Sequence, residues 1–189
     1  MHVFDPMPSS AEEKDLIKRC LNGERSAQRE LYDRYSGYMF AVSMRYAKSD
    51  QEAEDILQDA FIKVFQSLKK FEGRSALGTW IKRIVINTAL NSERGKIYMF
   101  PMVPVEEVND RFEVSLNSFE LDTLIGFVRE LPEGCQAIFN LYAIEGYSHK
   151  EIAKMLSVST GTSKSQYARA RKLLQEKVLK SENRNYEQA

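Results

Sequence analysis

Residues 148–174 read SHKEIAKMLSVSTGTSKSQYARARKLL, and the architecture expected for the chain follows from them. Ser148 and Glu151 have the spacing of a capping box, which predicts that a helix starts here. The segment Ser157-Val158-Ser159 interrupts the apolar pattern, and Ser159 can cap a second, longer helix. Two helices joined by so tight a turn are typical of a helix-turn-helix.

The second helix of this stretch has two different faces. Its inner stripe repeats every three or four residues: Ser163, Tyr167, Ala170, Leu174 and Val178. The opposite face carries Thr160, Lys164, Ala168, Arg171 and Lys172, flanked by Ser165 and Arg169. Hydroxyl groups near a helix start and basic residues further along suit the major groove of DNA. The alternative is an ordinary helical hairpin with a solvated basic face, which fits the same pattern.

Composition excludes several classes of protein. No apolar run approaches the ~20 residues that span a bilayer. The first residues, MHVFDPMPSS, lack both the basic start and the apolar core of a signal peptide. Cys20 and Cys135 lie within helical patterns and are predicted to be buried free thiols, as befits the cytoplasm. With two histidines and no cysteine cluster, we expect neither a metal site nor a cofactor.

Charge is balanced overall but unevenly distributed. The 27 basic and 27 acidic residues give no net charge. Residues 69–96 carry a net charge of +5 and residues 145–180 carry +5, whereas residues 101–133 between them carry −6. Two basic segments separated by an acidic one indicate two separate contacts with a polyanion.

Helical periodicity recurs through most of the chain, and no strand alternation or internal repeat is present, so the predicted fold is all-α. Ser10, Ser26, Asp50 and Thr79 are the expected helix starts, with Gly23 ending the first helix. The pattern dissolves over residues 97–117, which favours a linker, and returns over residues 119–130. Pro132 is expected in the first turn of the next helix, which Gly146 ends, and the polar tail after Lys180 is expected to fray.

Two features of the first half stand out. The helix after Asp50 carries polar and acidic residues on its outer face near its start, which by itself is typical of a solvated helix start. The basic loop KKFEGRSALGTW, residues 69–80, follows that helix. In the next helix Trp80, Ile81 and Ile84 are expected to face the core, leaving Lys82, Arg83 and Asn87 available to a partner.

Three blocks together resemble a bacterial sigma factor of the extracytoplasmic-function (ECF) group. They are AEDILQDAFIKVFQSLKKFEGRSALGTWIKRIVINTAL (53–90), LPEGCQAIFNLYAIEGYSHKEIAKML (131–156) and SVSTGTSKSQYARARKLL (157–174). The resemblance covers residues 31–174 in family order. It implies two small helical domains joined by a flexible linker, the C-terminal one a helix-turn-helix. Their expected bounds are residues 10–96, an acidic linker 97–118, and residues 119–180.

The resemblance also implies a role for each candidate residue. The N-terminal domain would bind core RNA polymerase through Glu54, Asp55, Gln58 and Asp59. It would bind the minus-ten promoter element through Lys69, Lys70, Phe71, Arg74, Lys82, Arg83 and Asn87. The C-terminal domain would bind the minus-thirty-five element, with Lys164, Ser165 and Arg169 in the groove and Thr160, Thr162 and Arg171 nearer phosphates.

The family further implies a cytoplasmic initiation factor that is not an enzyme and has no small-molecule substrate. Its expected partners are core RNA polymerase, promoter DNA and an anti-sigma factor, which in this group is often membrane-anchored. Ser163, Gln166 and Ala168 depart from residues common in the family, which leaves the base preference open. Two other interpretations of the residues are a dimeric helix-turn-helix repressor, which binds palindromic DNA unaided, and a helical adaptor that binds only proteins.

Overall fold

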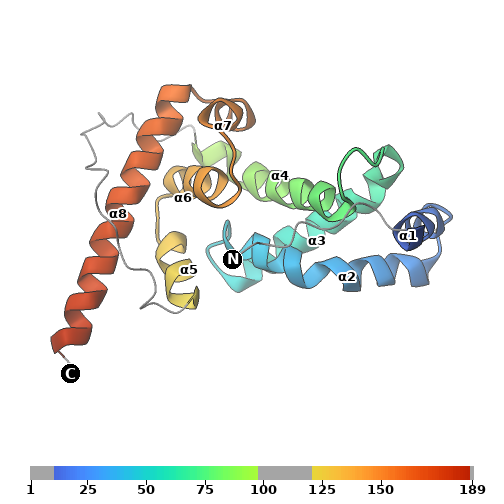
Figure 1. The fold of residues 1–189 in the computed structure, drawn as a ribbon, viewed down its shortest axis with the longest axis horizontal. Coiled ribbons are helices and arrows are strands. Elements are labelled where there is room, and N and C mark those ends of the chain that lie inside the picture. The colour runs from blue at the N-terminus through green and yellow to red at the C-terminus, as the bar shows by residue number, and fades with distance from the viewer. Residues whose placement is uncertain (1–10, 98–120, 188–189) are drawn as a thin grey trace. The chain divides into compact units, whose positions relative to one another are not determined.

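The computed structural model describes residues 11–97 and 121–187, and within these ranges every regular element is a helix (Figure 1). The chain divides between Asn91 and Ser92 into two compact units. The all-α fold class predicted from sequence is confirmed. Most of the acidic segment 97–118 lies outside the described residues, so the predicted domain bounds stay predictions. No described helix is both long enough and apolar enough to cross a membrane.

The N-terminal unit is built from helices α1 (Ala11–Leu21), α2 (Arg25–Met44) and α3 (Asp50–Ser67), the short 3₁₀ turn η1 (Leu68–Lys70), and α4 (Leu77–Ile97) as far as Asn91. α2 packs against both α1 and α3. Polar contacts join the helices as well. In a buried one, Tyr35 Oη donates to Glu13 Oε1 at 2.6 Å, and in a partly buried one, Lys63 Nζ donates to Thr88 Oγ1 at 3.2 Å. Gly23 adopts a φ of +82°, as expected of a glycine that ends a helix.

Three predicted helix starts in this unit need correction. Ser49, rather than Asp50, caps α3, because its side chain accepts a hydrogen bond from the Glu52 amide at 3.1 Å. α4 begins at Leu77, two residues before Thr79, and the Trp80 amide already donates to the Ala76 carbonyl. Leu77 is fully buried, so core packing starts this helix early. α2 begins at Arg25, one residue before Ser26.

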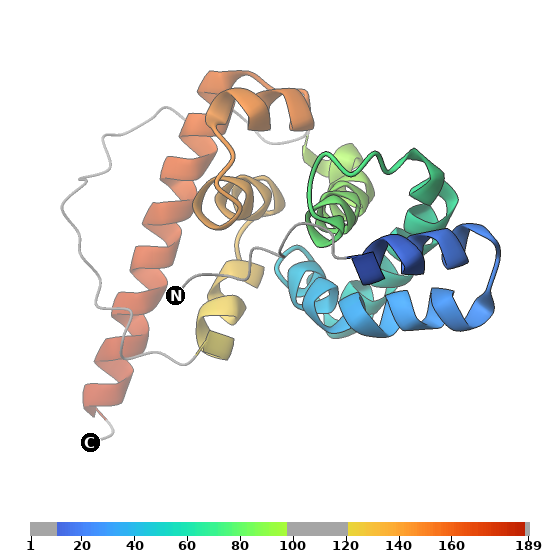
Figure 2. The ribbon, with the colours of Figure 1, turned by 45° about the vertical axis from the view of Figure 1, so that its right-hand side comes forward.

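The C-terminal unit contains α5 (Leu121–Arg129), α6 (Glu133–Phe139), the π-helical turn η3 (Asn140–Ile144), α7 (His149–Leu156) and α8 (Thr160–Glu187). α6 and α7 both pack against α8 (Figures 1 and 2). Leu131, Cys135 and Ala170 form a buried cluster, covered by Val128, Phe139, Leu173 and Leu174.

The capping predictions for this unit are confirmed. The position of Pro132 differs from what the sequence predicted. Ser148 and Glu151 form the capping box, whose hydrogen bonds lower the pKa of Glu151. Gly146 has a φ of +79°. Pro132 precedes α6 as its N-cap residue instead of lying in its first turn. α8 continues through the polar tail after Lys180 to Glu187, since no glycine or proline stops it, and the predicted fraying of this tail stays a prediction.

Candidate nucleic-acid interface

The turn between α7 and α8 is three residues long. Ser157 adopts the left-handed conformation, with a φ of 55°, and its neighbour Val158 donates its amide to the Ala153 carbonyl at 3.0 Å. Ser159 Oγ then accepts the Thr162 amide at 2.9 Å, which caps the start of α8. Together these contacts hold the two helices of a helix-turn-helix at a fixed angle.

The inner face of α8 packs against the rest of the C-terminal unit through polar contacts as well as apolar ones. Ser163, Gln166 and Ala170 are all buried. The Cys135 thiol donates to Gln166 Oε1 at 3.0 Å. Burial raises the pKa of Cys135 to about 11, so at neutral pH the group keeps its proton and acts as this donor. Gln166, one of the departures from the family pattern, is therefore turned into the core and away from the outer face of α8.

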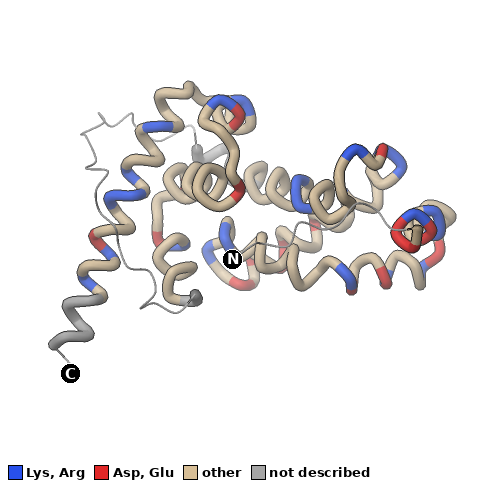
Figure 3. The backbone as a smooth tube through the Cα atoms, viewed as in Figure 1, with Lys and Arg blue, Asp and Glu red and all other residues tan. Residues whose placement is uncertain are grey.

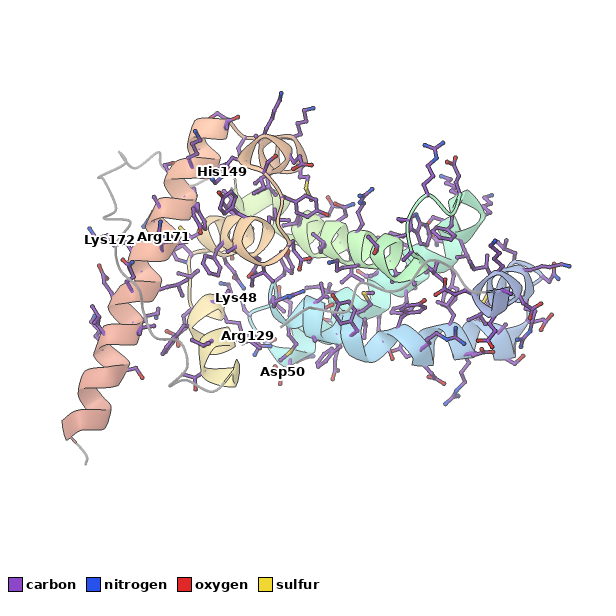
Figure 4. All side chains as sticks on the ribbon, viewed as in Figure 1. Lys48, Asp50, Arg129, His149, Arg171 and Lys172 are labelled. Carbon is purple, nitrogen blue, oxygen red and sulfur yellow. The ribbon has the colours of Figure 1, made fainter. Side chains whose placement is uncertain are left out.

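The outer face of α8 carries the candidate minus-thirty-five residues in two rows, and basic residues recur along it (Figure 3). Thr160, Lys164, Ala168 and Arg171 form one row at three- and four-residue spacing, and Thr162, Ser165, Arg169 and Lys172 form the other. Thr160, Lys164 and Lys172 are exposed, whereas Thr162, Ser165, Arg169 and Arg171 are half-buried. Arg171 and Lys172 both project from α8 in Figure 4.

Two hydroxyl groups at the start of α8 already have partners within the turn and helix. Thr162 Oγ1 lies 2.8 Å from Ser159 Oγ, and Ser165 Oγ donates to the Thr162 carbonyl at 3.1 Å. Both hydroxyl groups keep lone pairs with which to accept a further bond. Ser165 would have to give up the Thr162 carbonyl to donate one elsewhere. Lys164 is the candidate groove residue that the fold leaves most exposed.

His149, the first residue of α7, contacts α8 through a cluster of rings. Its imidazole stacks on Tyr142 at a centroid distance of 4.2 Å and meets the edge of Tyr167 at 5.8 Å. Its Nδ1 shares a hydrogen bond of 2.9 Å with Ser163 Oγ. Burial of the ring, and next the positive charge of Lys164, lower the pKa of His149. The folded unit therefore favours the neutral imidazole.

The candidate minus-ten residues lie in the loop before α4 and on the first half of α4. Lys69, Lys70 and Arg74 are exposed, but Arg74 Nε pairs with Glu72 Oε2 at 2.6 Å within the loop. The ring of Phe71 is half-buried and packs on Trp80 at a centroid distance of 5.4 Å. On α4, Arg83 and Asn87 are exposed and Lys82 is half-buried. The structure thus brings the basic loop and the exposed face of α4 together.

Trp80 and Ile84 are not in the core as the sequence predicted, since both are half-buried. Ile81 is buried as predicted, and Leu77, Val85, Ile86, Ala89 and Leu90 complete the core face of α4. Trp80, Arg83, Ile84 and Asn87 have the spacing of one helical face. An aromatic ring next to a cation is the kind of surface that binds unstacked bases, and this spacing could have revealed it from sequence.

The four candidate polymerase-binding residues of α3 are all exposed, as predicted for a docking face. Beside them, a groove of about 370 Å³ runs between α2 and α3, lined by Tyr32, Ser36, Gly37, Phe40, Glu54, Leu57 and Gln58. Ile62, 55% exposed, lies one turn after Gln58. The face therefore combines acidic groups with apolar surface. The contribution of α2 was missed, although Tyr32, Ser36 and Phe40 recur every four residues.

Within residues 11–97 and 121–187, no cluster of side chains could hold a metal ion. The described surfaces offer charge, aromatic rings and hydroxyl groups at the positions set out above. They are suited to binding macromolecules.

Comparison with known proteins identifies the family. Residues 31–96 match the model of sigma-70 region 2, and residues 121–174 match that of sigma-70 region 4. The ECF RNA polymerase sigma-E factor of Escherichia coli K12 is 30% identical over 177 residues, which cover 86% of this chain and 92% of that protein. The chain belongs to the sigma-70 family. It is an ECF-type sigma factor, and thus a promoter-specific initiation factor for RNA polymerase.

Other relatives agree with this assignment. The ECF RNA polymerase sigma-E factor of Haemophilus influenzae is 28% identical, over 91% of this chain and 98% of that protein. The RNA polymerase sigma-H factor of Pseudomonas aeruginosa is 29% identical, over 89% and 94%. Among solved structures, the same fold is found in the sigma factor RpoE of Bartonella quintana, which was solved in complex with the anti-sigma factor NepR. The TM-score is 0.51, and the two sequences are 23% identical over 80% of this chain and 96% of that one.

The lowered pKa of His149 predicts how the stability of the C-terminal unit of this sigma factor depends on pH. The unfolded chain, with an ordinary histidine pKa of about 6.5, binds the proton more readily than the folded unit. The free energy of unfolding should therefore fall as the pH drops below about 6.5 and level off below the folded pKa. The positive charge of Lys164 on α8 also opposes protonation of the ring, and Glu151 titrates at lower pH.

Urea denaturation followed by circular dichroism, between about pH 7.5 and 5, measures this dependence. His149→Phe keeps a ring against Tyr142 but cannot bind a proton, so its stability should fall less over the same range. Equal falls in the two proteins would contradict the assignment to His149.

Proposed function

We propose that this sigma factor binds core RNA polymerase through α3 and binds promoter DNA through two separate surfaces, one in each unit. In this proposal it acts in the cytoplasm and catalyses no reaction itself. The domain bounds are those given by the sequence, residues 10–96 and 119–180 with a linker between them. The observation that carries the proposal is that sigma-70 regions 2 and 4 fall on two compact helical units, each with its own exposed basic surface.

α8 is the proposed reader of the minus-thirty-five element. Its inner face is buried against α6 and α7, so only its outer rows can enter a groove. The exposed Lys164 and the half-buried Ser165 and Arg169 lie within the first three turns, where recognition helices approach base edges. The exposed residues Thr160 and Gly161 lie at the helix N-terminus, which favours a backbone phosphate.

The loop 69–76 and the first half of α4 are the proposed minus-ten surface. Opening a duplex costs a few kcal/mol for each unstacked base, which a binding surface must offset. Lys69, Lys70 and Arg83 supply exposed positive charge, and the packed pair Phe71 and Trp80 supplies aromatic surface. The ion pair of Arg74 with Glu72 is exposed and so holds Arg74 only weakly, which leaves it able to turn to a phosphate.

The face of α3 is the proposed contact with polymerase. Glu54, Asp55, Gln58 and Asp59 are exposed in adjacent rows, and Glu54 and Gln58 also line the groove between α2 and α3, to which Phe40 and Leu57 add apolar surface. An interface of this kind gains specificity from its charged rim and affinity from the apolar anchor. We expect the complementary surface of polymerase to be basic and to insert an apolar side chain into the groove.

An anti-sigma factor is proposed as a further partner. The Bartonella quintana sigma factor that shares this fold was solved with one bound. Such a partner would compete for the surfaces that bind polymerase. The membrane anchorage common for anti-sigma factors of the ECF group would then connect a signal at the membrane to transcription.

Substitutions in α8 test the minus-thirty-five assignment. If the side chain contacts a base, Lys164→Ala or Arg169→Ala should weaken promoter binding by roughly 1–3 kcal/mol. If it contacts a phosphate, the loss should be smaller, and the slope of log affinity against log salt concentration should decrease by about one. The measurement is the affinity of reconstituted holoenzyme for a promoter selected from a genomic library. Lys180→Ala is the matched control, since that exposed lysine lies about 24 Å from Lys164 along the axis of α8. Unchanged affinity in both test variants would remove the assignment.

Substitutions in α3 test the polymerase contact. Asp55→Ala combined with Gln58→Ala should lower the affinity for core RNA polymerase, because both exposed side chains lie on the proposed docking face. The fold should be retained, because neither side chain is buried. Asp15→Ala removes one exposed carboxylate from α1 and serves as the control. Binding measured by fluorescence anisotropy should weaken about tenfold for the double variant and not for the control. Retained binding of the double variant would discredit this face.

A further inference from the structure

His149 lies where α7 begins and reaches the buried face of the recognition helix (Figure 4). Its Nδ1 is bonded to Ser163 Oγ, and its ring is held by stacking on Tyr142 and by the edge of Tyr167. Ser163 is fully buried, and it lies in the first turn of α8. The contact therefore joins the start of one helix of the motif to the start of the other, 14 residues apart.

The position of Ser163 determines what the bond can control. Successive residues of an α-helix are turned by about 100°, so fixing the direction of one side chain fixes the directions of its neighbours. The next two residues, Lys164 and Ser165, are candidate groove contacts. A rotation of α8 by about 20° would move side-chain atoms about 5–6 Å from its axis by about 2 Å, enough to break a hydrogen bond to a base.

Apolar packing alone fixes such a rotation less tightly than a hydrogen bond does. Apolar burial is not directional, and the inner stripe of α8 includes the small residue Ala170. Hydrogen bonds depend on angle as well as distance. The hydrogen bonds that reach the buried face of α8 include one between His149 and Ser163 and one from Cys135 to Gln166. The first lies nearer the end of α8 that is proposed to enter DNA.

We propose that His149 is a positioning residue for promoter recognition. Its bond to Ser163 sets the rotation of α8 and so determines how Lys164 and Ser165 are presented to the minus-thirty-five element. The inference rests on the proposed role of α8 and adds to it the residue that aligns the helix. His149 itself need not touch DNA.

The test uses full-length protein, core RNA polymerase and a promoter that the wild-type pair transcribes, alongside the same promoter with its minus-thirty-five element scrambled. His149→Phe keeps a ring on Tyr142 and removes the bond, so the ratio of transcription from the two templates should fall about threefold to tenfold. His149→Asn places an amide near the position of Nδ1 and should retain most of the ratio. Affinity for core polymerase should stay unchanged, because its proposed surface is in the other unit.

An unchanged ratio in His149→Phe would overturn the inference. An equal loss in His149→Phe and His149→Asn would also overturn it, because the amide would then restore nothing that the bond to Ser163 supplies. Should His149→Phe fail to fold by circular dichroism, Ser163→Ala removes the same bond and carries the same expectation.

A second measurement separates this inference from the proposed function. Amide NMR of the free protein should show shifted signals for Lys164 and Ser165 in His149→Phe but not in His149→Asn. Unshifted signals in His149→Phe would overturn the positioning role, whatever the transcription assay gives. A wild-type protein that transcribes no promoter would count against the proposed function alone.

Discussion

The burial of one face of α8 is the constraint on which the C-terminal unit depends. Ala170, fully buried next to Cys135 and Leu131, lets α6 pack closely against α8, while Ile152 and Leu156 bring α7 to its first turns. A unit of this size has few other apolar side chains to bury, so this face cannot be exchanged for another. Because the inner face is committed to the core, the two rows that carry Lys164 and Arg169 are left for a partner.

Local chemistry explains why so much of the fold could be predicted. The capping box at Ser148, the cap at Ser159 and the glycines that end helices act within a few residues, so their sequence spacing is enough. The predicted helix starts were wrong where a neighbouring residue made the cap or where a tertiary contact extended the helix. Ser49 caps α3 in place of Asp50, and burial of Leu77 starts α4 before Thr79. The continuation of α8 through a polar tail shows that polarity alone does not end a helix.

For the candidate sites, the sequence could predict which face of each helix is exposed, but not which distant residues contact one another. Periodicity placed the α3 acids and most α8 cations on outer surfaces, and exposure in the structure agrees for Asp55 and Lys164. Sequence could not pair residues that are distant along the chain. The bonds of Cys135 to Gln166 and of His149 to Ser163 span 31 and 14 residues. These contacts decide which polar side chains are turned inward, as Gln166 is, and no periodic pattern reveals that choice.

In vitro transcription from a genomic promoter library, with purified protein and core RNA polymerase, tests the central claim most directly. We expect the protein to bind core enzyme and to yield transcripts from a limited set of promoters that share both a minus-ten and a minus-thirty-five element. Core enzyme left unbound, with no transcript beyond those that core enzyme makes alone, would contradict it.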